Sequence, residues 1–344
     1  MMLNNELKEN FTIGIKDDLN NTELKHYSYE LKENYDEIKI YGYGSDGSIG
    51  ASKDLLKIIG EGKFVQGYFE YDSKKSGGLT ISHLRFSDNK IEAPYYLTNP
   101  KIIVITKEQY ISKYDILDNI MENGELIINT QKNEKELNEL LPNNIKNIIR
   151  EKNIKVSTID ADKIADSNGI KGRIGIIIES VILNKLNIKN YQDKLIDLIK
   201  KRFSIKGNDI VTANINAINN ISLTNIVIDN NKTIENNNKK SIIDIINCGK
   251  GNTLSTKDLY YYNTGIMNGG NTKYEKRGLS NITAKWIKEN CIECGMCSIV
   301  CPHAVIRPII DGPDSLEHIK DFATNKNYSV IISKEDCTGC GLCS

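Results

Sequence analysis

The sequence predicts an α/β domain over residues 1–225, a linker segment over residues 226–284 and a small cysteine-rich α+β domain over residues 285–344. Apolar strand-like runs alternate with helical patterns through the first two-thirds of the chain, which indicates an α/β fold. From about Ala213 to Ser241 the chain becomes rich in Asn, Ile and Lys, which is typical of a fading helix followed by a linker. Seven of the eight cysteines then fall between Cys291 and Cys343.

The composition argues against two classes of partner. The 344 residues include 45 basic and 45 acidic side chains, so no global field draws the chain to nucleic acid or to an anionic membrane. The start, MMLNNELKENFTIG, lacks the regions of a signal peptide, and no apolar run approaches the roughly 18 residues of a membrane span. We therefore expect a cytoplasmic protein with no nucleic-acid or membrane partner.

The strands of the α/β domain are predicted from five runs, which are IKIYGYG, FVQGYFEY, KIIVIT, ELIINT and IKVSTID. Residues 102–106 are apolar at alternate positions of both sets, so both faces of this strand are apolar, as a sheet covered on both faces requires. Ile174 to Leu186 is apolar nearly all round and predicts a buried helix, whereas Tyr191 to Phe203 is amphipathic and predicts a surface helix.

A glycine-rich turn, GSDGSIG over residues 44–50, links the first strand to a helix. A strand, a glycine turn and a helix N-terminus make a Rossmann-like anion cradle, because free backbone N–H groups and the helix dipole point at one place. Gly42, Gly44 and Gly47 also satisfy GxGxxG, with Glu70 or Asp72 at about the distance of a ribose-binding acid. A dinucleotide site is therefore an alternative.

Two lysines, Lys74 and Lys75, lie in a loop of small residues about thirty positions further on. Two ammonium groups beside a glycine turn suit a ligand with several phosphates. A solvated turn between strands is the competing interpretation. Arg85, in the following strand-like run, is expected either to add a third charge or to be exposed.

The cysteine-rich end matches the bacterial ferredoxin run CxxCxxCxxxCP at residues 291–302, which predicts a ferredoxin-like fold around 4Fe-4S clusters. The fourth cysteine of such a run serves the second cluster, so Cys301 joins the second triplet, Cys337, Cys340 and Cys343. Cys291, Cys294 and Cys297 form three-quarters of the other set, because the sequence stops at Ser344. Two zinc sites are the alternative. His303 is expected to pack rather than to ligate, and Cys248 to be a bystander.

Four stretches in order, YGYGSDGSIGASK, QGYFEYDSKKSGGLTISHLRF, YEKRGL and CIECGMCSIVCPHAVIRP, resemble pyruvate:ferredoxin (flavodoxin) oxidoreductase. The resemblance implies the coenzyme A domain, the connecting Glu-Lys-Arg segment at residues 275–277 and most of the two-cluster domain. It implies coenzyme A contacts at Gly44, Ser45, Asp46, Gly47, Ser48, Lys74 and Lys75, and cluster ligands at the seven clustered cysteines.

The family activity that this resemblance implies belongs to an assembly. Pyruvate is decarboxylated on thiamine diphosphate, coenzyme A collects the acetyl group, and electrons pass to ferredoxin or flavodoxin. No pyruvate-binding or thiamine-binding motif is recognisable here, so the partners expected are the parts that carry them. Gly175 stands where a ligand-contacting asparagine is expected, and Asn220 where an arginine is usual. A separate iron-sulfur carrier with a nucleotide-binding or structural α/β domain, or a gene fragment without function, are the alternatives.

Overall fold

The structure is a computed structural model, and it describes residues 9–24, 35–72, 78–229, 231, 241–267, 269–271, 276–280 and 282–344. The chain forms two compact units, Met1–Lys257 and Asp258–Ser344. Each unit is described by itself. Across the described ranges, no helix is both long enough and apolar enough to cross a membrane.

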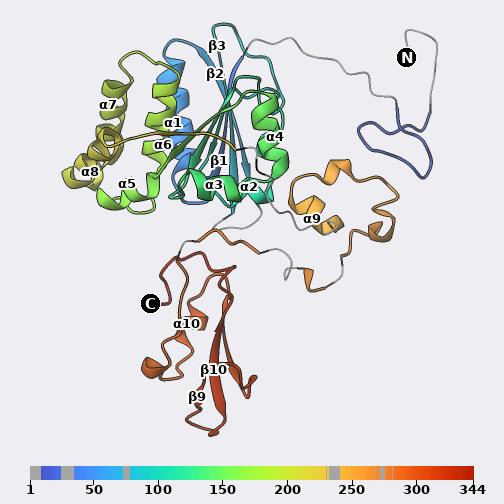
Figure 1. Cartoon of the computed structure of the whole chain (residues 1–344), viewed down its shortest axis with the longest axis vertical. Coiled ribbons are helices and arrows are strands. Elements are labelled where there is room, and N and C mark those ends of the chain that lie inside the picture. Colours follow the sequence, from blue (N-terminus) through green and yellow to red (C-terminus); the bar gives the residue numbers. More distant parts are fainter. Residues whose placement is uncertain are drawn as a thin grey trace. The chain divides into compact units, whose positions relative to one another are not determined.

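A mixed sheet forms the centre of the first unit (Figure 1). In the described part of that unit, seven strands pair in the order β2-β3-β1-β4-β5-β6-β7. Strands β1, β4, β5 and β6 run parallel, and antiparallel pairs join β3 to β1, β2 to β3 and β7 to β6. The strands are β1 (Asp36–Tyr43), β2 (Phe64–Tyr71), β3 (Leu79–Ser87), β4 (Ile102–Ile105), β5 (Glu125–Asn129), β6 (Lys155–Ile159) and β7 (Thr224–Ile226).

The sequence accounts for the parallel centre of this sheet. All four residues of β4 are buried, as are Leu126, Ile127 and Ile128 of β5, because helices and loops cover both faces. The five predicted strand runs coincide with β1, β2, β4, β5 and β6, so the α/β prediction is confirmed. The strand-like run that contains Arg85 forms β3, which completes an antiparallel hairpin with β2.

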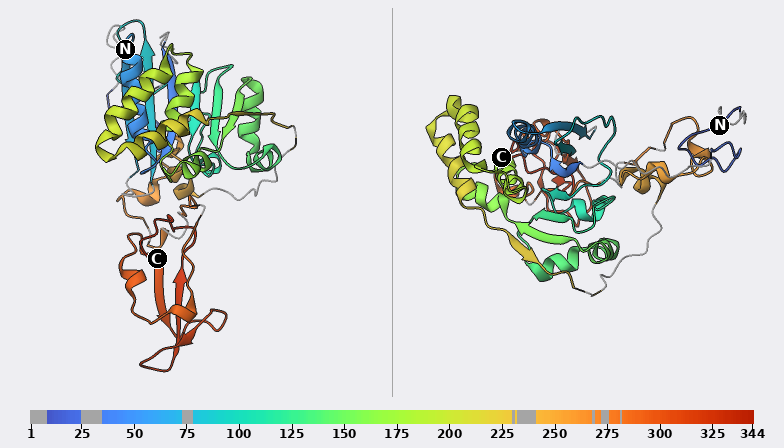
Figure 2. Two further views of the ribbon diagram at one scale, coloured as in Figure 1. Left: turned by 90° about the vertical axis from the view of Figure 1, so that its left-hand side faces the viewer. Right: turned by 90° about the horizontal axis from the view of Figure 1, so that it is seen from above.

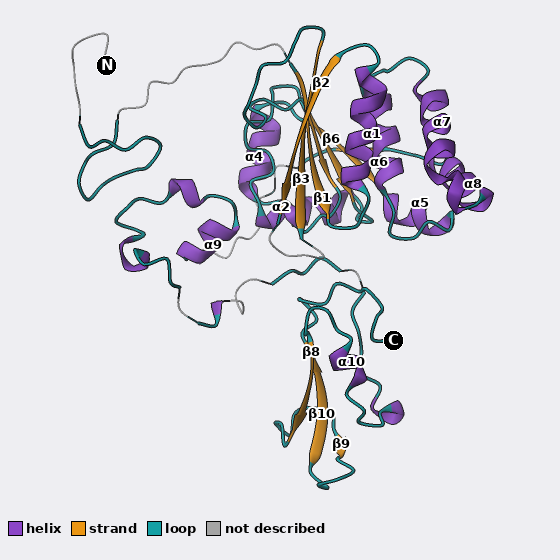
Figure 3. Ribbon diagram, turned by 180° about the vertical axis from the view of Figure 1, so that it is seen from behind, coloured by secondary structure: helices purple, strands orange, loops and turns teal. Residues whose placement is uncertain are grey.

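Helices cover the sheet on both sides (Figure 3). Helices α1 and α6 pack together against one face, with α7 and α8 outside them, and α4 lies on the other side (Figures 2 and 3). The helices of this unit are α1 (Ser48–Gly60), α2 (Tyr110–Lys113), α3 (Glu134–Leu140), α4 (Asn143–Glu151), α5 (Ala161–Ser167), α6 (Gly175–Lys185), α7 (Tyr191–Phe203), α8 (Asn208–Asn219) and α9 (Ile242–Asn247).

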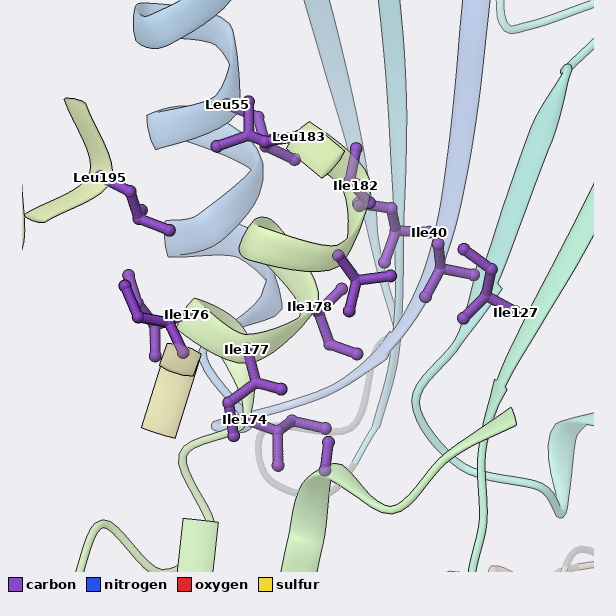
Figure 4. Packing of buried hydrophobic residues seen from close by; sticks show 14 of the residues in the cluster. Ile40, Leu55, Ile127, Ile174, Ile176, Ile177, Ile178, Ile182, Leu183 and Leu195 are labelled. Carbon is purple, nitrogen blue, oxygen red and sulfur yellow. The ribbon is translucent and has the colours of Figure 1, made fainter. Parts of the chain in front are cut away.

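Helix α6 forms the middle of the core between α1, α7 and the sheet (Figure 4). Its residues 175–183 are all buried, because Ile182 and Leu183 sit against Leu55 of α1 and Ile40 of β1 while other side chains meet α7. Helix α7 buries only Leu195 and Ile199 fully. Both helix predictions, one buried and one amphipathic, are therefore confirmed.

The second unit is a small α+β fold. Its described residues include an antiparallel sheet in the order β8-β10-β9, a short helix α10 (Met296–Ile299) and an apolar core around Val305, Ile306 and Cys337. The strands are β8 (Ile306–Ile310), β9 (Ile319–Lys320) and β10 (Asn327–Ile332). All three of these strands lie in the segment that separates the two cysteine triplets, so that segment forms a folded part of the unit rather than a simple turn.

Candidate functional site

The glycine turn of the first unit is closed by Asp46. Strand β1 ends at Tyr43 and α1 begins at Ser48, and between them Ser45 (φ 84°) and Gly47 (φ 88°) adopt left-handed backbone conformations. The buried Asp46 carboxylate accepts the backbone N–H groups of Tyr43 and Ser48, each at 2.8 Å. Asp46 therefore shapes the loop, and the groups left to meet an anion are backbone N–H groups of the first turn of α1.

A polar network ties this loop to the neighbouring parallel strands. Thr106, directly after β4, donates its hydroxyl to Asp46 Oδ2 at 2.8 Å. Asn129, at the end of β5, donates its amide to the Thr106 carbonyl at 3.0 Å and to Asp162 Oδ2 at 2.9 Å. The carboxyl ends of β1, β4 and β5 thus lie together at the point where the connections that follow β1 and β4 lead to opposite sides of the sheet. In an open α/β sheet, ligands usually bind at this edge. The polar residues that follow each apolar run were the signal that could have identified Thr106 and Asn129.

A second helix N-terminus reaches the same loop. The N–H of Gly175, the first residue of α6, donates to the Asp46 carbonyl at 3.2 Å. A Cβ on Gly175 would lie 2.5 Å from the carbonyl oxygen of Gly47, so only glycine fits without moving the backbone. This close approach accounts for the glycine at a position where an asparagine was expected. Two helix dipoles consequently present their positive ends to one turn.

Two buried hydroxyl groups lie beneath the turn. Ser48 Oγ and Thr80 Oγ1 have no hydrogen-bond partner among the described residues, although both residues are buried. A Cβ on Gly42 would fall 2.0 Å from the first oxygen and 2.7 Å from the second, so Gly42 leaves the space that these two oxygens occupy. A buried hydroxyl without a partner costs stability, so these two groups are a local cost of the turn.

The lysine loop starts and ends beside the glycine turn. Gly44 N–H donates to the Gly78 carbonyl at 2.9 Å, and Asp72 N–H donates to the Leu79 carbonyl at 3.0 Å. Lys74 and Lys75 themselves lie outside the described residues. That these two lysines and the glycine turn form one phosphate-binding surface therefore stays a prediction.

Arg85 belongs to the core rather than to the surface. Its side chain is 1% exposed and donates to the buried Glu37 carboxylate at 2.7 Å. It also donates to Gln66 Oε1 at 3.0 Å and to the Tyr96 carbonyl at 2.6 Å. The expectation of a third ligand-binding or exposed charge was wrong, because Glu37 pairs with this guanidinium from the neighbouring strand.

The strand order does not fit the dinucleotide alternative. In that fold the strand after the first helix lies beside the first strand. Here β3 separates β2 from β1. Glu70 on β2 instead contacts His83 Nε2 at 2.5 Å, and this hydrogen bond is the main reason that the pKa of Glu70 is lowered, against the opposing effect of burial. Glu70 therefore has a local partner within the hairpin.

Four cysteines of the second unit line one cavity. A cavity of about 220 Å³ is lined by Cys301 together with Cys337, Cys340 and Cys343, and its wall is mainly apolar. Burial raises the pKa of the Cys343 thiol, and the neighbouring thiols of the set raise it further against a backbone hydrogen bond. Four neighbouring thiols can lose their protons together only when a cation offsets the repulsion between the thiolates. This set of ligands therefore fits a metal-sulfur group.

The first triplet lies near another part of the same unit. Cys294 is exposed, and Cys291 and Cys297 are half-buried. Burial raises the pKa of Tyr328 on β10, and Cys291 and Cys297 raise it further, so these cysteines lie near that ring. His303 lines the cavity of the second set.

The arrangement of the cysteines gives no support to the alternative of two zinc sites. Within the described residues, no three His, Cys, Asp or Glu side chains are placed to hold a single metal ion. The four thiols are instead among the residues that line a cavity of about 220 Å³, which has room for more than a single ion.

The segment before the cysteines is fixed to the second triplet. Glu275 lies outside the described residues, but Lys276 pairs with Asp336 at 2.7 Å. Gly278 N–H donates to the Glu335 carbonyl at 2.6 Å. The connecting segment thereby supports the loop that precedes Cys337.

Comparison with known proteins gives two family matches. A model described as "Pyruvate ferredoxin/flavodoxin oxidoreductase" matches residues 37–222, and one described as "4Fe-4S binding domain" matches residues 284–307. The chain is 34% identical over 372 residues to pyruvate:ferredoxin oxidoreductase of Moorella thermoacetica, covering 98% of this chain and 31% of that protein. It is 32% identical over 364 residues to pyruvate-flavodoxin oxidoreductase of Klebsiella pneumoniae, covering 97% of this chain and 31% of the relative.

Among solved structures, pyruvate oxidoreductase subunit PORC from Thermotoga maritima aligns with 56% of this chain and 99% of its own, with 23% identity and a TM-score of 0.45. The chain spans about a third of the length of the curated relatives it matches.

Proposed function

Because the chain belongs to the pyruvate ferredoxin/flavodoxin oxidoreductase family, we propose that it supplies the coenzyme A-binding and electron-relay parts of an enzyme that converts pyruvate to acetyl-coenzyme A and carbon dioxide. The remaining parts of the enzyme, in this proposal, bind pyruvate and thiamine diphosphate. Ferredoxin or flavodoxin accepts the electrons. The domain limits at residues 225 and 284 are part of the same proposal.

The observation that carries the coenzyme A proposal is the glycine turn with two helix N-termini, α1 and α6, against it. Backbone N–H groups at such a place favour a diphosphate, because they donate to its oxygens and the helix dipoles favour negative charge. Gly44, Ser45, Gly47 and Ser48 line this turn. The N–H groups of Gly44 and Ser48 already donate to the Gly78 carbonyl and to Asp46, which holds the shape of the turn, so the ligand meets the other N–H groups of the turn and of the start of α1. Lys74 and Lys75 add charge from the loop that begins and ends at the turn.

The cysteines are assigned to two clusters in this proposal. Cys301, Cys337, Cys340 and Cys343 hold one 4Fe-4S cluster, and Cys291, Cys294 and Cys297 contribute three ligands to the other. When bound, such clusters supply one-electron transfer. The side chains of Val305 and Ile306 exclude water from one side of the cavity, and the Lys276–Asp336 pair fixes the chain next to Cys337.

Calorimetry with the full chain tests the coenzyme A assignment. We expect coenzyme A to bind, and Lys75→Ala to weaken binding by about 1–3 kcal/mol, as loss of a charge-assisted hydrogen bond does. Lys135→Ala, an exposed lysine in α3, is the matched control and should leave the affinity unchanged. Absence of binding at millimolar coenzyme A, or preferential binding of a nicotinamide cofactor, would refute the assignment.

A further inference from the structure

A lysine and a histidine lie side by side in the sheet of the first unit, and the proposed function uses neither. Lys39 of β1 is directly opposite His83 of β3 in the antiparallel register. Directly opposed residues on one face of such a pair have Cβ atoms about 4.5–5.5 Å apart. The flexible four-carbon stem of Lys39 can therefore bring its amine to the imidazole ring of His83.

The ring of His83 is buried and held by two neighbours. Its Nε2 lies 2.5 Å from Glu70 Oε1, and the ring of Tyr96 stacks on it with 4.5 Å between the centroids. An ionised carboxylate only accepts hydrogen bonds, so Nε2 carries the proton of this contact and Nδ1 of the neutral ring keeps a lone pair. Nδ1 is buried and has no hydrogen-bond partner among the described residues. This lone pair is therefore available as a base.

The amine of Lys39 lacks the carboxylate partner that many lysines of this chain have. Among the described residues it forms no ion pair, and its Nζ lies 5.2 Å from the centre of the Tyr41 ring. Burial lowers the pKa of Lys39, against the opposing effect of three acidic residues, Glu70, Asp118 and Asp115. A lower pKa increases the fraction of the amine that can act as a nucleophile at a given pH. Because Lys39 is only half-buried, a small molecule can still reach it.

Glu70, His83 and Lys39 together have the arrangement of an acid, a histidine and a nucleophile. In such a set the acid fixes the tautomer of the imidazole, and the imidazole takes a proton from the nucleophile as it attacks. Each member comes from a different strand, β2, β3 and β1 in turn, so the pairing of these strands fixes their spacing.

We propose that Lys39 is a site of self-acylation, at which the amine takes an acyl group from a thioester with His83 as the general base. The Nζ lone pair attacks the carbonyl carbon of the thioester, a C–N bond forms and the C–S bond breaks. The proton that the amine loses passes to His83 Nδ1 and from there to the departing thiolate, so the products are an amide and a free thiol. The choice of an acyl thioester rests on the proposed function, because acetyl-coenzyme A is its product.

The test uses S-acetyl-N-acetylcysteamine, a small thioester without a nucleotide, on the full chain at neutral pH, with acetylation of each lysine followed by peptide mass spectrometry. We expect Lys39 to be acetylated roughly tenfold faster than Lys155, a modest share of what a positioned base contributes. Lys155 on β6 is exposed, so accessibility alone favours the opposite order. His83→Gln should remove most of the advantage of Lys39 and leave the rate at Lys155 unchanged. His318→Gln, at an exposed histidine of the second unit, is the control and should change neither rate.

The outcomes separate this inference from the function on which it rests. Acetylation of Lys39 no faster than that of Lys155 in the unaltered chain would overturn the proposal, and so would a His83→Gln chain in which Lys39 keeps its advantage. Because the first comparison needs no variant, it stands even if a substitution at the buried histidine affects folding. Failure of coenzyme A to bind would overturn the proposed function but leave this result unchanged, since the probe carries no nucleotide.

Discussion

Gly175→Ala tests the contact that joins the two helix N-termini at the glycine turn. The new methyl group would lie 2.5 Å from the Gly47 carbonyl oxygen and 2.7 Å from its carbonyl carbon. An ordinary carbon–oxygen contact is about 3.3 Å or longer, so the backbones must separate by roughly 0.8 Å. Both atoms belong to the main chain, so no side-chain rotation relieves the overlap.

The expected cost follows from two opposing effects. Overpacking of a tight contact destabilises by about 1–3 kcal/mol. Alanine is favoured over glycine within a helix by about 1 kcal/mol at most, and by less at the first helical position. Separation of the segments also lengthens the 3.2 Å hydrogen bond from Gly175 N–H to the Asp46 carbonyl. We therefore expect a net loss of about 1–2 kcal/mol in the free energy of unfolding.

Urea unfolding followed by circular dichroism measures this loss, and hydrogen exchange locates it. Protection should fall in the peptides that contain the glycine turn and the start of α6. Gly62→Ala is the control, because nothing lies within 4 Å of the added methyl, and it should change stability by less than about 0.5 kcal/mol. A Gly175→Ala chain as stable as the unaltered one, with unchanged protection at the turn, would refute the close-contact argument.

Three further predictions concern other parts of the chain. Arg85→Met should lower the free energy of unfolding in urea by about 3–5 kcal/mol, because it leaves the buried Glu37 carboxylate without its cation. Adding Glu37→Gln should recover part of that loss. Equal stability of the single and double variants would contradict this. The pKa of Glu179 is higher in the folded state than in the unfolded state, so the stability that this carboxyl contributes is fully present below about pH 4.5 and is lost as pH rises through the folded pKa. Glu179→Gln should therefore match the parent in urea midpoint at low pH and exceed it at neutral pH. A difference in midpoint that does not change with pH would be inconsistent with a raised pKa. After anaerobic reconstitution, the Cys301→Ser chain should contain less iron and sulfide than the parent by about the amount in one cluster, while the Cys248→Ser control keeps the full amount. Equal iron content in the two variants would argue against the ligand set assigned to the cavity.

The elements that depend on neighbouring residues were predictable from the sequence. The apolar run at residues 102–105 became a fully buried strand, and the patterns of α6 and α7 gave one buried and one amphipathic helix. The spacing of the cysteines grouped Cys301 with the later triplet, and the same four residues line one cavity. These features follow from backbone periodicity and from fixed spacing along a short segment, which a sequence displays directly.

The contacts between distant residues were decided only by the tertiary structure. The order of the strands placed β3 between β1 and β2, which removed the dinucleotide interpretation of GxGxxG. Arg85 meets Glu37 and Gly175 meets Gly47 across long stretches of chain, so neither the buried ion pair nor the need for glycine could be recognised locally. Periodicity tells which face of an element is apolar, but not which element covers that face or which backbone approaches it, because many pairings bury the same apolar area.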